Sequence, residues 1–224
     1  MAAADTSHSD ARIAAALAAA RTPDGVSLDA LSRRSPVLIL FLRHFGCVFC
    51  REMVAQVARD RDAIAARGTQ VAFVHMGTED QARVFFDQFG VGHLPRVSDR
   101  GRQIYAAFAL GTVGARQAVS PYLWRRWVAL FRDRRMRGRF IGDVRQMSGA
   151  FLIDRGAIVK AFRHDSMAEA VDLDEMTTCP LPARQDGGGG HRKTNAPSGR
   201  HDVGGDRGRA VTTTGRSAAD RSRV

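Results

Sequence analysis

The strongest structural signal in this chain lies in residues 37–50, which read Val37-Leu38-Ile39-Leu40-Phe41-Leu42-Arg43-His44-Phe45-Gly46-Cys47-Val48-Phe49-Cys50. Its first six residues form a continuous apolar run, which predicts a strand buried on both faces, as in a mostly parallel sheet. The following apolar residues share one helical face: Cys50, Met53, Val54, Val57 and Ile64. Gly68 stands where such a helix is expected to end. A buried strand leading into an amphipathic helix is typical of α/β proteins.

The same alternation of strand and helix continues along the chain. We expect a second strand at about 70–75, and Thr78 to Gln81 match a capping box before a helix with an apolar phenylalanine stripe. A short strand at 96–98, a short helix at 102–108, a hairpin of strands 150–153 and 157–162, and a last short helix within 166–176 follow. This order predicts a layered α/β domain with parallel central strands and an antiparallel edge.

The two ends of the chain differ in composition from its middle. Residues 1–26 are interpreted as an N-terminal helical extension, with a helix from Ala11 to Arg21 capped by Ser9 or Asp10. Residues 27–182 form the main domain, with an insertion at about 111–147. Residues 183–224 contain no aromatic residue and no Leu, Ile or Met, so we expect a disordered basic tail.

The formal net charge of +11 is concentrated in two segments of the chain. Pro121 to Met147 holds eight basic and two acidic residues, and the tail from Ala183 holds nine and four, while the remainder is balanced. Within the insertion, Trp124, Trp127 and Phe131 form a helical stripe among arginines. We interpret the stripe as packing on the domain with the arginines in water. A role in covering a substrate pocket, or contact with a membrane surface or nucleic acid, stays open, with nucleic acid an unlikely partner.

The cysteines restrict the class of protein. Three cysteines are an odd number, which argues against a disulfide-stapled secreted scaffold. The start of the chain lacks the pattern of a secretory signal, and no apolar run reaches the length of a transmembrane segment. We therefore expect a cytoplasmic protein without a membrane span.

Cys47 and Cys50 form a C-x-x-C pair where the first strand passes into a helix. A thiol at a helix start faces unpaired backbone N–H groups, which favour the thiolate and lower its pKa below the free value of about 8.5. Cys50 lies on the apolar stripe and should point inward. Cys47 should reach the surface at the carboxyl end of the strand, where open α/β sheets present their sites. Cys47 is therefore the expected attacking thiol and Cys50 its resolving partner.

Basic residues surround the two cysteines in the sequence, and a metal site is the alternative to redox chemistry. Arg43, His44 and Arg51 lie close in sequence and could add positive potential to the thiols. A zinc site needs about four ligands, whereas the chain has no second C-x-x-C and Cys179 lies beside the tail. We therefore expect no metal, and we take Cys179 as incidental.

The segment from Phe41 to Glu52 resembles the active-site segment of the peroxiredoxin-like family, which is related to the alkyl hydroperoxide reductase and thiol-specific antioxidant (AhpC/TSA) enzymes. Ser98 to Tyr105 and Gly149 to Gly156 are similar to two later segments of that family, so the resemblance covers about 27–176. It implies a thioredoxin-like three-layer α/β/α sandwich with a helical basic insertion before the C-terminal β-hairpin.

The resemblance also implies an activity. It suggests an antioxidant thiol oxidoreductase that reduces a peroxide or a disulfide, with Cys47 as the reactive thiol and Cys50 as the second one. No cofactor is expected, because the electrons come from an external thiol donor such as thioredoxin or glutathione. Peroxiredoxins carry a proline, a Ser/Thr and an arginine where this chain has Leu40, His44 and Ser148. Arg43 or His44 would then have to take over the orientation of the peroxide.

A second hypothesis needs no turnover. The chain would be a redox-fold binding module that uses its basic insertion and tail to hold an acidic partner or nucleic acid. Such binding should depend on salt and should survive the loss of Cys47.

Overall fold

The computed structural model describes residues 2–112, 138–164 and 170–178. The helical stripe of the predicted insertion, Cys179 and the predicted tail lie outside these residues. Among the helices that are described, none is long and apolar enough to cross a membrane.

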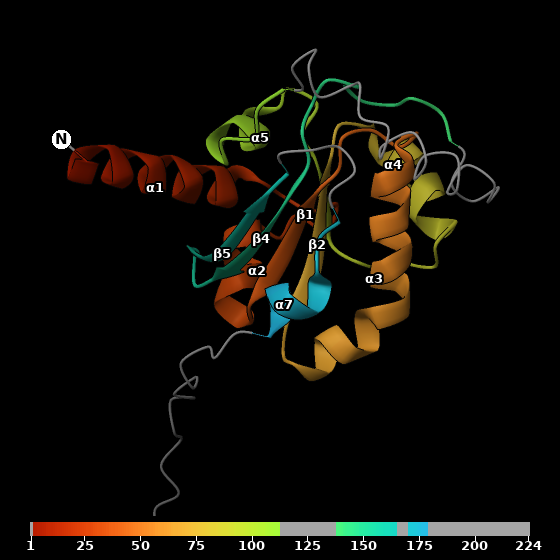
Figure 1. Cartoon of the computed structure of the whole chain (residues 1–224), viewed down its shortest axis with the longest axis horizontal. Coiled ribbons are helices and arrows are strands. Elements are labelled where there is room, and N and C mark those ends of the chain that lie inside the picture. The colour runs from red at the N-terminus through yellow and green to blue at the C-terminus, as the bar shows by residue number, and fades with distance from the viewer. Residues whose placement is uncertain (1, 113–137, 165–169, 179–224) are drawn as a thin grey trace, which may run out of the picture. The chain divides into compact units, whose positions relative to one another are not determined.

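Five strands form one mixed sheet in the order β3-β2-β1-β4-β5 (Figure 1). Their bounds are β1 Val37–Phe41, β2 Gln70–His75, β3 Arg96–Ser98, β4 Gly149–Asp154 and β5 Ala157–Arg163. β1 pairs in parallel with β2, and β2 with β3, whereas β4 runs antiparallel to both β1 and β5. The predicted strands and the antiparallel hairpin are confirmed.

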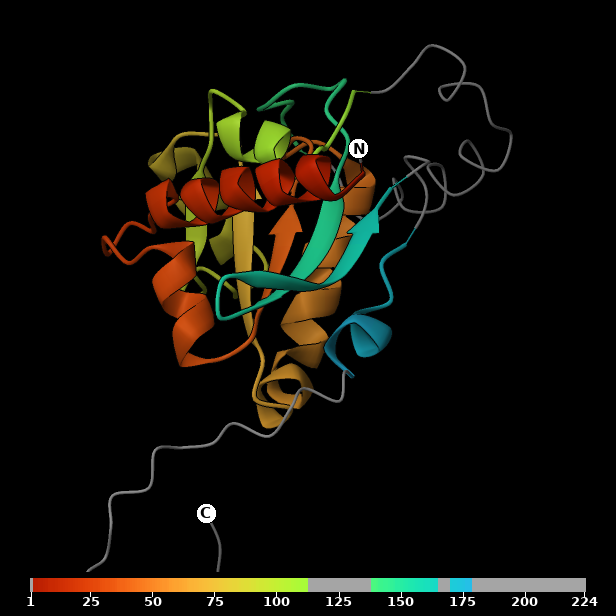
Figure 2. The same ribbon diagram turned by 90° about the vertical axis from the view of Figure 1, so that its left-hand side faces the viewer.

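Helices cover both faces of this sheet. Their bounds are α1 Ala2–Ala19, α2 Leu28–Arg34, α3 Val48–Ala66, α4 Glu79–Asp87, α5 Gln103–Ala107 and α7 Leu173–Thr177. Figures 1 and 2 show α3 on one face of the sheet, and α1 with α2 on the other. The predicted three-layer α/β/α architecture is therefore confirmed.

The central strand β1 supplies the core on both faces, because all of its residues are buried. Leu38 and Leu40 belong to the cluster under α3 and α4, whereas Ile39 and Phe41 belong to the cluster under α1, α2 and α5. This alternation follows the two-residue period of a strand. It explains why the sequence of β1 is apolar throughout and fixes the position of the chain that leaves its carboxyl end.

Local signals marked most helix boundaries but not all of them. The capping box is present, since the Thr78 hydroxyl accepts from the Gln81 backbone N–H and the Gln81 side chain accepts from that of Thr78. The prediction for α1 is wrong at its start: the helix begins at Ala2, so Ser9 and Asp10 lie inside it. Alanine is the best helix former, and the alanine-rich start carries the helix past these two polar residues.

The short helix α2 was absent from the sequence prediction. Its cap is Ser27, whose hydroxyl accepts a hydrogen bond from the Ala30 backbone N–H. Seven residues are too few for a helix to be stable on its own. Burial of Leu28 and Leu31 against the sheet, which depends on the tertiary structure, supplies the missing stability.

The buried aromatic residues between the sheet and helices α1 and α5 allow the assigned core to be tested. Phe151 is fully buried, and its ring lies 4.8 Å from that of Phe108 and 5.6 Å from that of Phe41. Phe151→Ala should lower the free energy of unfolding by about 3–5 kcal/mol, because it leaves a cavity. Phe140→Ala, at a phenylalanine that is 73% exposed, should change it by less than about 0.5 kcal/mol. Denaturant unfolding measures both, and equal losses would contradict the assigned core.

Candidate active site

The two predicted thiols lie where β1 gives way to α3. Cys47 is the N-cap residue of α3, and its backbone N–H donates to the His44 carbonyl at 3.0 Å. Cys50 follows in the first turn, and its sulfur accepts from the Arg43 backbone N–H at 3.3 Å. Both cysteines are free thiols. The strand and the helix therefore hold the pair in one tight turn.

The two thiols have opposite acidities. A hydrogen bond from the Cys50 thiol, followed by the Arg43 charge and the backbone N–H groups of Cys50 and Phe49, outweighs burial and lowers the pKa of Cys47 from 9.0 to about 6. The pKa of Cys50 is raised, because its proton bonds Cys47 and because it is buried. At neutral pH the pair therefore carries its negative charge on Cys47, and the thiolate is the reactive form of a cysteine.

The expectation that Cys47 reaches the surface is wrong. Its exposed fraction is only 5%. A segment from the far end of the predicted insertion, residues 138–146 and here called the cover, lies against residues 43–46 of the loop that carries the thiols. Within it, the Ile141 carbonyl accepts from the Phe45 backbone N–H at 3.0 Å, and Gly142 forms a β-bridge with His44.

The close approach of two backbones explains the glycines at this contact. A Cβ atom at Gly46 would lie 2.9 Å from the carbonyl oxygens of Gly138 and Arg139. Gly142 has a φ of +120°, and a Cβ there would lie 2.8 Å from the Arg43 carbonyl oxygen. Any side chain at Gly46 or Gly142 would therefore push the cover away from the cysteines.

Arg43 joins the cover to the reactive thiol. Its guanidinium is buried and donates to the carbonyls of Gln146, at 2.8 Å, and Val144, at 2.5 Å. A third nitrogen lies 3.9 Å from the Cys47 sulfur. Among the described residues no carboxylate pairs with Arg43, so the Cys47 thiolate is the anion that faces this charge.

Gln146 is a site residue that the sequence analysis missed. It is buried, and its side-chain amide donates to the Leu110 and Gly111 carbonyls, at 3.0 Å each. These bonds hold Gln146 in place, and its own backbone carbonyl accepts the hydrogen bond from Arg43. A glutamine that acts on a residue 103 positions away in the chain leaves no local pattern by which it could have been found.

Arg51 was expected to add positive potential, but its contacts lead elsewhere. It donates to the Phe45 carbonyl at 3.0 Å and to the Gln88 side chain at 2.9 Å. Its guanidinium also lies 5.1 Å from the ring centres of Phe85 and Phe89. These contacts anchor the loop that carries the thiols to α4.

His44 and Ser148 complete the set of predicted residues. The ring of His44 packs 5.1 Å from that of Phe140, and burial together with the Arg43 charge lowers its pKa to about 4, so the ring is neutral at pH 7. No hydrogen bond to its Nδ1 is found in the described part of the chain. Ser148 is buried just before β4, where its carbonyl accepts from the His164 backbone N–H. No hydrogen bond joins Ser148 to either cysteine within the described ranges.

Tyr105 links the carboxyl ends of β1 and β2, close to the thiols. It is fully buried, and its hydroxyl donates to the carbonyls of Leu42, at 2.5 Å, and Val74, at 3.0 Å. Burial, then the nearby Cys50 and Asp99, raises its pKa, so it stays protonated. Asp99 caps the helix that carries Tyr105 by accepting from three backbone N–H groups. The two residues thus fix the carboxyl ends of β1 and β2.

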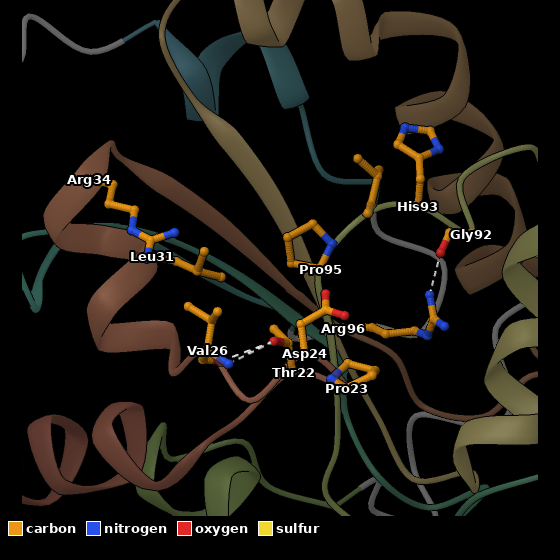
Figure 3. Close-up of a pocket in the computed structure, with 11 residues that line it drawn as sticks. Thr22, Pro23, Asp24, Val26, Leu31, Arg34, Gly92, His93, Pro95 and Arg96 are labelled. Carbon is orange, nitrogen blue, oxygen red and sulfur yellow. Dashed lines mark hydrogen bonds between the residues drawn. The ribbon is translucent and has the colours of Figure 1, made fainter.

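One hollow lies at the amino end of the parallel strand β3, away from the cysteines. It has a volume of about 420 Å³ and lies between the α1–α2 connection and residues 92–96 (Figure 3). These residues include the amino end of β3, whereas the cysteines follow the carboxyl end of the parallel strand β1. Its buried Arg96 is already paired with Glu79. The hollow therefore does not serve Cys47. No cluster of three metal-ligand side chains occurs among the residues that are described.

Comparison with known proteins gives a consistent family signal. A family model described as AhpC/TSA antioxidant enzyme matches residues 56–166, a range that begins after Cys50 and does not include the two thiols. Prostamide/prostaglandin F synthase of Salmo salar is 26% identical over 159 residues, covering 69% of this chain and 78% of that protein.

Solved structures share the fold at low identity. Reduced Prx3 of Vibrio vulnificus in complex with H2O2 superposes with a TM-score of 0.51 at 12% identity, over 70% of this chain and 88% of that one. A cysteine-to-serine mutant of peroxiredoxin 6 from Arenicola marina gives 0.50 at 10% identity, over 70% of this chain and 66% of that one. The thioredoxin-like fold expected from the sequence resemblance is confirmed, while the helical part of its predicted insertion lies outside the described residues.

The Arg43 charge can be tested through the acidity of Cys47. In a Cys179→Ser background, alkylation of Cys47 should accelerate as the pH rises through about 6, because the thiolate is the nucleophile. Arg43→Gln removes a favourable charge, so the midpoint should move upward, toward the ordinary value of 9.0. Mass spectrometry of the Cys47 peptide follows the reaction. The control is Arg139→Gln, on the exposed side of the cover, and a midpoint shared by both variants would refute the role of Arg43.

Proposed function

Because this chain belongs to the peroxiredoxin-like family related to the AhpC/TSA antioxidant enzymes, we propose that it is a thiol-dependent peroxide reductase that works through Cys47 and Cys50. The observation that carries this proposal is the lowered pKa of Cys47, next to a thiol that keeps its proton. A nucleophile and its resolving partner thus stand in one turn.

The first step consumes the peroxide. The Cys47 thiolate attacks the distal oxygen of ROOH, the O–O bond breaks, and a proton from solvent leaves with ROH. Cys47 becomes a sulfenic acid, oxidised by two electrons. Arg43 lies 3.9 Å from the attacking sulfur and can donate to the oxygen on which negative charge develops. His44 is neutral and offers a second polar group from the same loop.

The second and third steps restore the enzyme. The Cys50 thiol condenses with the sulfenic acid, forming a disulfide and releasing water that carries the Cys50 proton. Two thiols of an external donor, thioredoxin-like or glutathione, then reduce this disulfide and are themselves oxidised to a disulfide. No cofactor enters the cycle.

A peroxide fits this site better than a disulfide substrate. Attack on a disulfide would need the same thiolate, but it would have to bring a bulky sulfur pair to an atom that is only 5% exposed. Because relatives of this chain are named prostamide/prostaglandin F synthase, the formation of prostamide or prostaglandin F is a further activity to assay. The binding-module hypothesis rests on segments outside the described residues, and it does not account for the acidity of Cys47.

Two cysteine variants test the assignment. Cys47→Ser should abolish peroxide consumption driven by an external thiol. Cys50→Ser should consume one equivalent of peroxide and then accumulate a sulfenic acid that dimedone traps at Cys47, because the resolving thiol is gone. Peroxide consumption and mass spectrometry measure both results.

The third cysteine supplies the matched control. Cys179→Ser should retain full turnover, since it leaves the pair of thiols intact. Turnover in Cys47→Ser equal to that of the control would rule out Cys47 as the nucleophile.

A further inference from the structure

A second hollow opens beside the cover, with a volume of about 510 Å³. It is lined by Met76, Arg100, Arg102, Gly142, Asp143 and Val144. We propose that this hollow binds the carboxylate of an anionic hydroperoxide, and that the carboxylate competes with Asp143 for Arg102 and so loosens the cover where it lies against the loop that carries Cys47. The inference rests on the proposed peroxide reductase and adds a substrate class and a means of access.

The hollow has an excess of positive charge. Its lining includes two arginines, Arg100 and Arg102, but one acidic residue, Asp143. Arg100 is exposed, and none of the hydrogen bonds or ion pairs within the described ranges involves its guanidinium. The nearby Asp99 carboxylate accepts from backbone N–H groups of α5. One arginine is thus available for a ligand carboxylate, which guanidiniums bind in a two-pronged geometry.

The wall of the hollow connects directly to the reactive thiol. Val144 lines the hollow, and its carbonyl accepts a hydrogen bond from Arg43. Another nitrogen of the same guanidinium lies 3.9 Å from the Cys47 sulfur. One side chain thus spans the distance between the hollow and the nucleophile. Met76 and Val144 add apolar surface that suits the hydrocarbon part of a substrate.

The ion pair between Arg102 and Asp143 fastens the middle of the cover. Their side chains meet at 2.6 Å and are 45% and 33% exposed. Asp143 lies between Gly142, which bridges to His44, and Val144, which receives Arg43. A partly exposed ion pair is weak, so an incoming carboxylate can take its place. Once Asp143 is displaced, the cover loses its attachment to Arg102 and is held by its bonds to Arg43 and to the Phe45 backbone, which leaves it more mobile.

Two substrates that differ in one carboxylate test the specificity. We compare kcat/KM for cumene hydroperoxide and for its para-carboxylate analogue. The full chain should favour the carboxylate by about tenfold, the effect of one charged hydrogen bond. The ratio should fall to about one in Arg100→Gln, mainly through KM. Arg145→Gln, an exposed arginine of the cover that does not line the hollow, should keep the ratio of the unchanged chain.

Release of the cover is tested without any peroxide. The probe 4-isopropylbenzoate should speed alkylation of Cys47 by iodoacetamide, whereas the uncharged 4-isopropylbenzamide should not. Arg100→Gln should lose this acceleration, whereas Arg102→Gln, which lacks the ion pair, should be alkylated fast with or without the probe. In Asp143→Asn, which lacks the ion pair, alkylation should be fast without the probe.

The possible outcomes separate this inference from the proposed function. Turnover of both hydroperoxides at a ratio of about one in the unchanged chain, or no acceleration by 4-isopropylbenzoate, would overturn the carboxylate site while leaving the peroxide reductase intact. Acceleration by the probe in a chain that consumes neither hydroperoxide would support the site and refute the reductase.

Discussion

A buried guanidinium holds the site together. Arg43 carries a permanent charge into a place where water cannot balance it, and such a charge is costly unless acceptors and an anion surround it. Two carbonyls of the cover and the Cys47 thiolate meet this requirement. The acidity of the thiol, the position of the cover and the end of β1 therefore depend on one another.

The fold supplies the precision that this arrangement needs. The core on both faces of β1 fixes where Arg43 leaves the sheet, and Tyr105 fastens the ends of β1 and β2. Gln146 holds the opposite side by fixing the backbone that accepts Arg43. This arrangement also offers a physical reason why the chain can lack the arginine that peroxiredoxins carry before the late strand. Ser148 replaces an arginine before the late strand, while Arg43 brings a guanidinium to the thiol from the loop after β1.

Much of the fold could be predicted because its signals are local. The apolar run of β1, the helical stripe around Val54 and the capping box at Thr78 each lie within a few neighbouring residues, and all are confirmed. The start of α1 and the existence of α2 could not be predicted in the same way. The first depends on alanine propensity outweighing two capping residues, and the second on burial that exists only after the layers have packed.

Local patterns in the sequence predicted most of the strands and helices in chain order and placed the C-x-x-C pair at the start of α3. The burial of Cys47, the approach of Arg43 to its sulfur and the contacts of Gln146 could be read only from the folded chain. The reason is distance along the chain. A helix start acts on a thiol through adjacent backbone groups, whereas the cover reaches Cys47 from about a hundred residues away, through backbone contacts that any sequence with glycine in the right places could make.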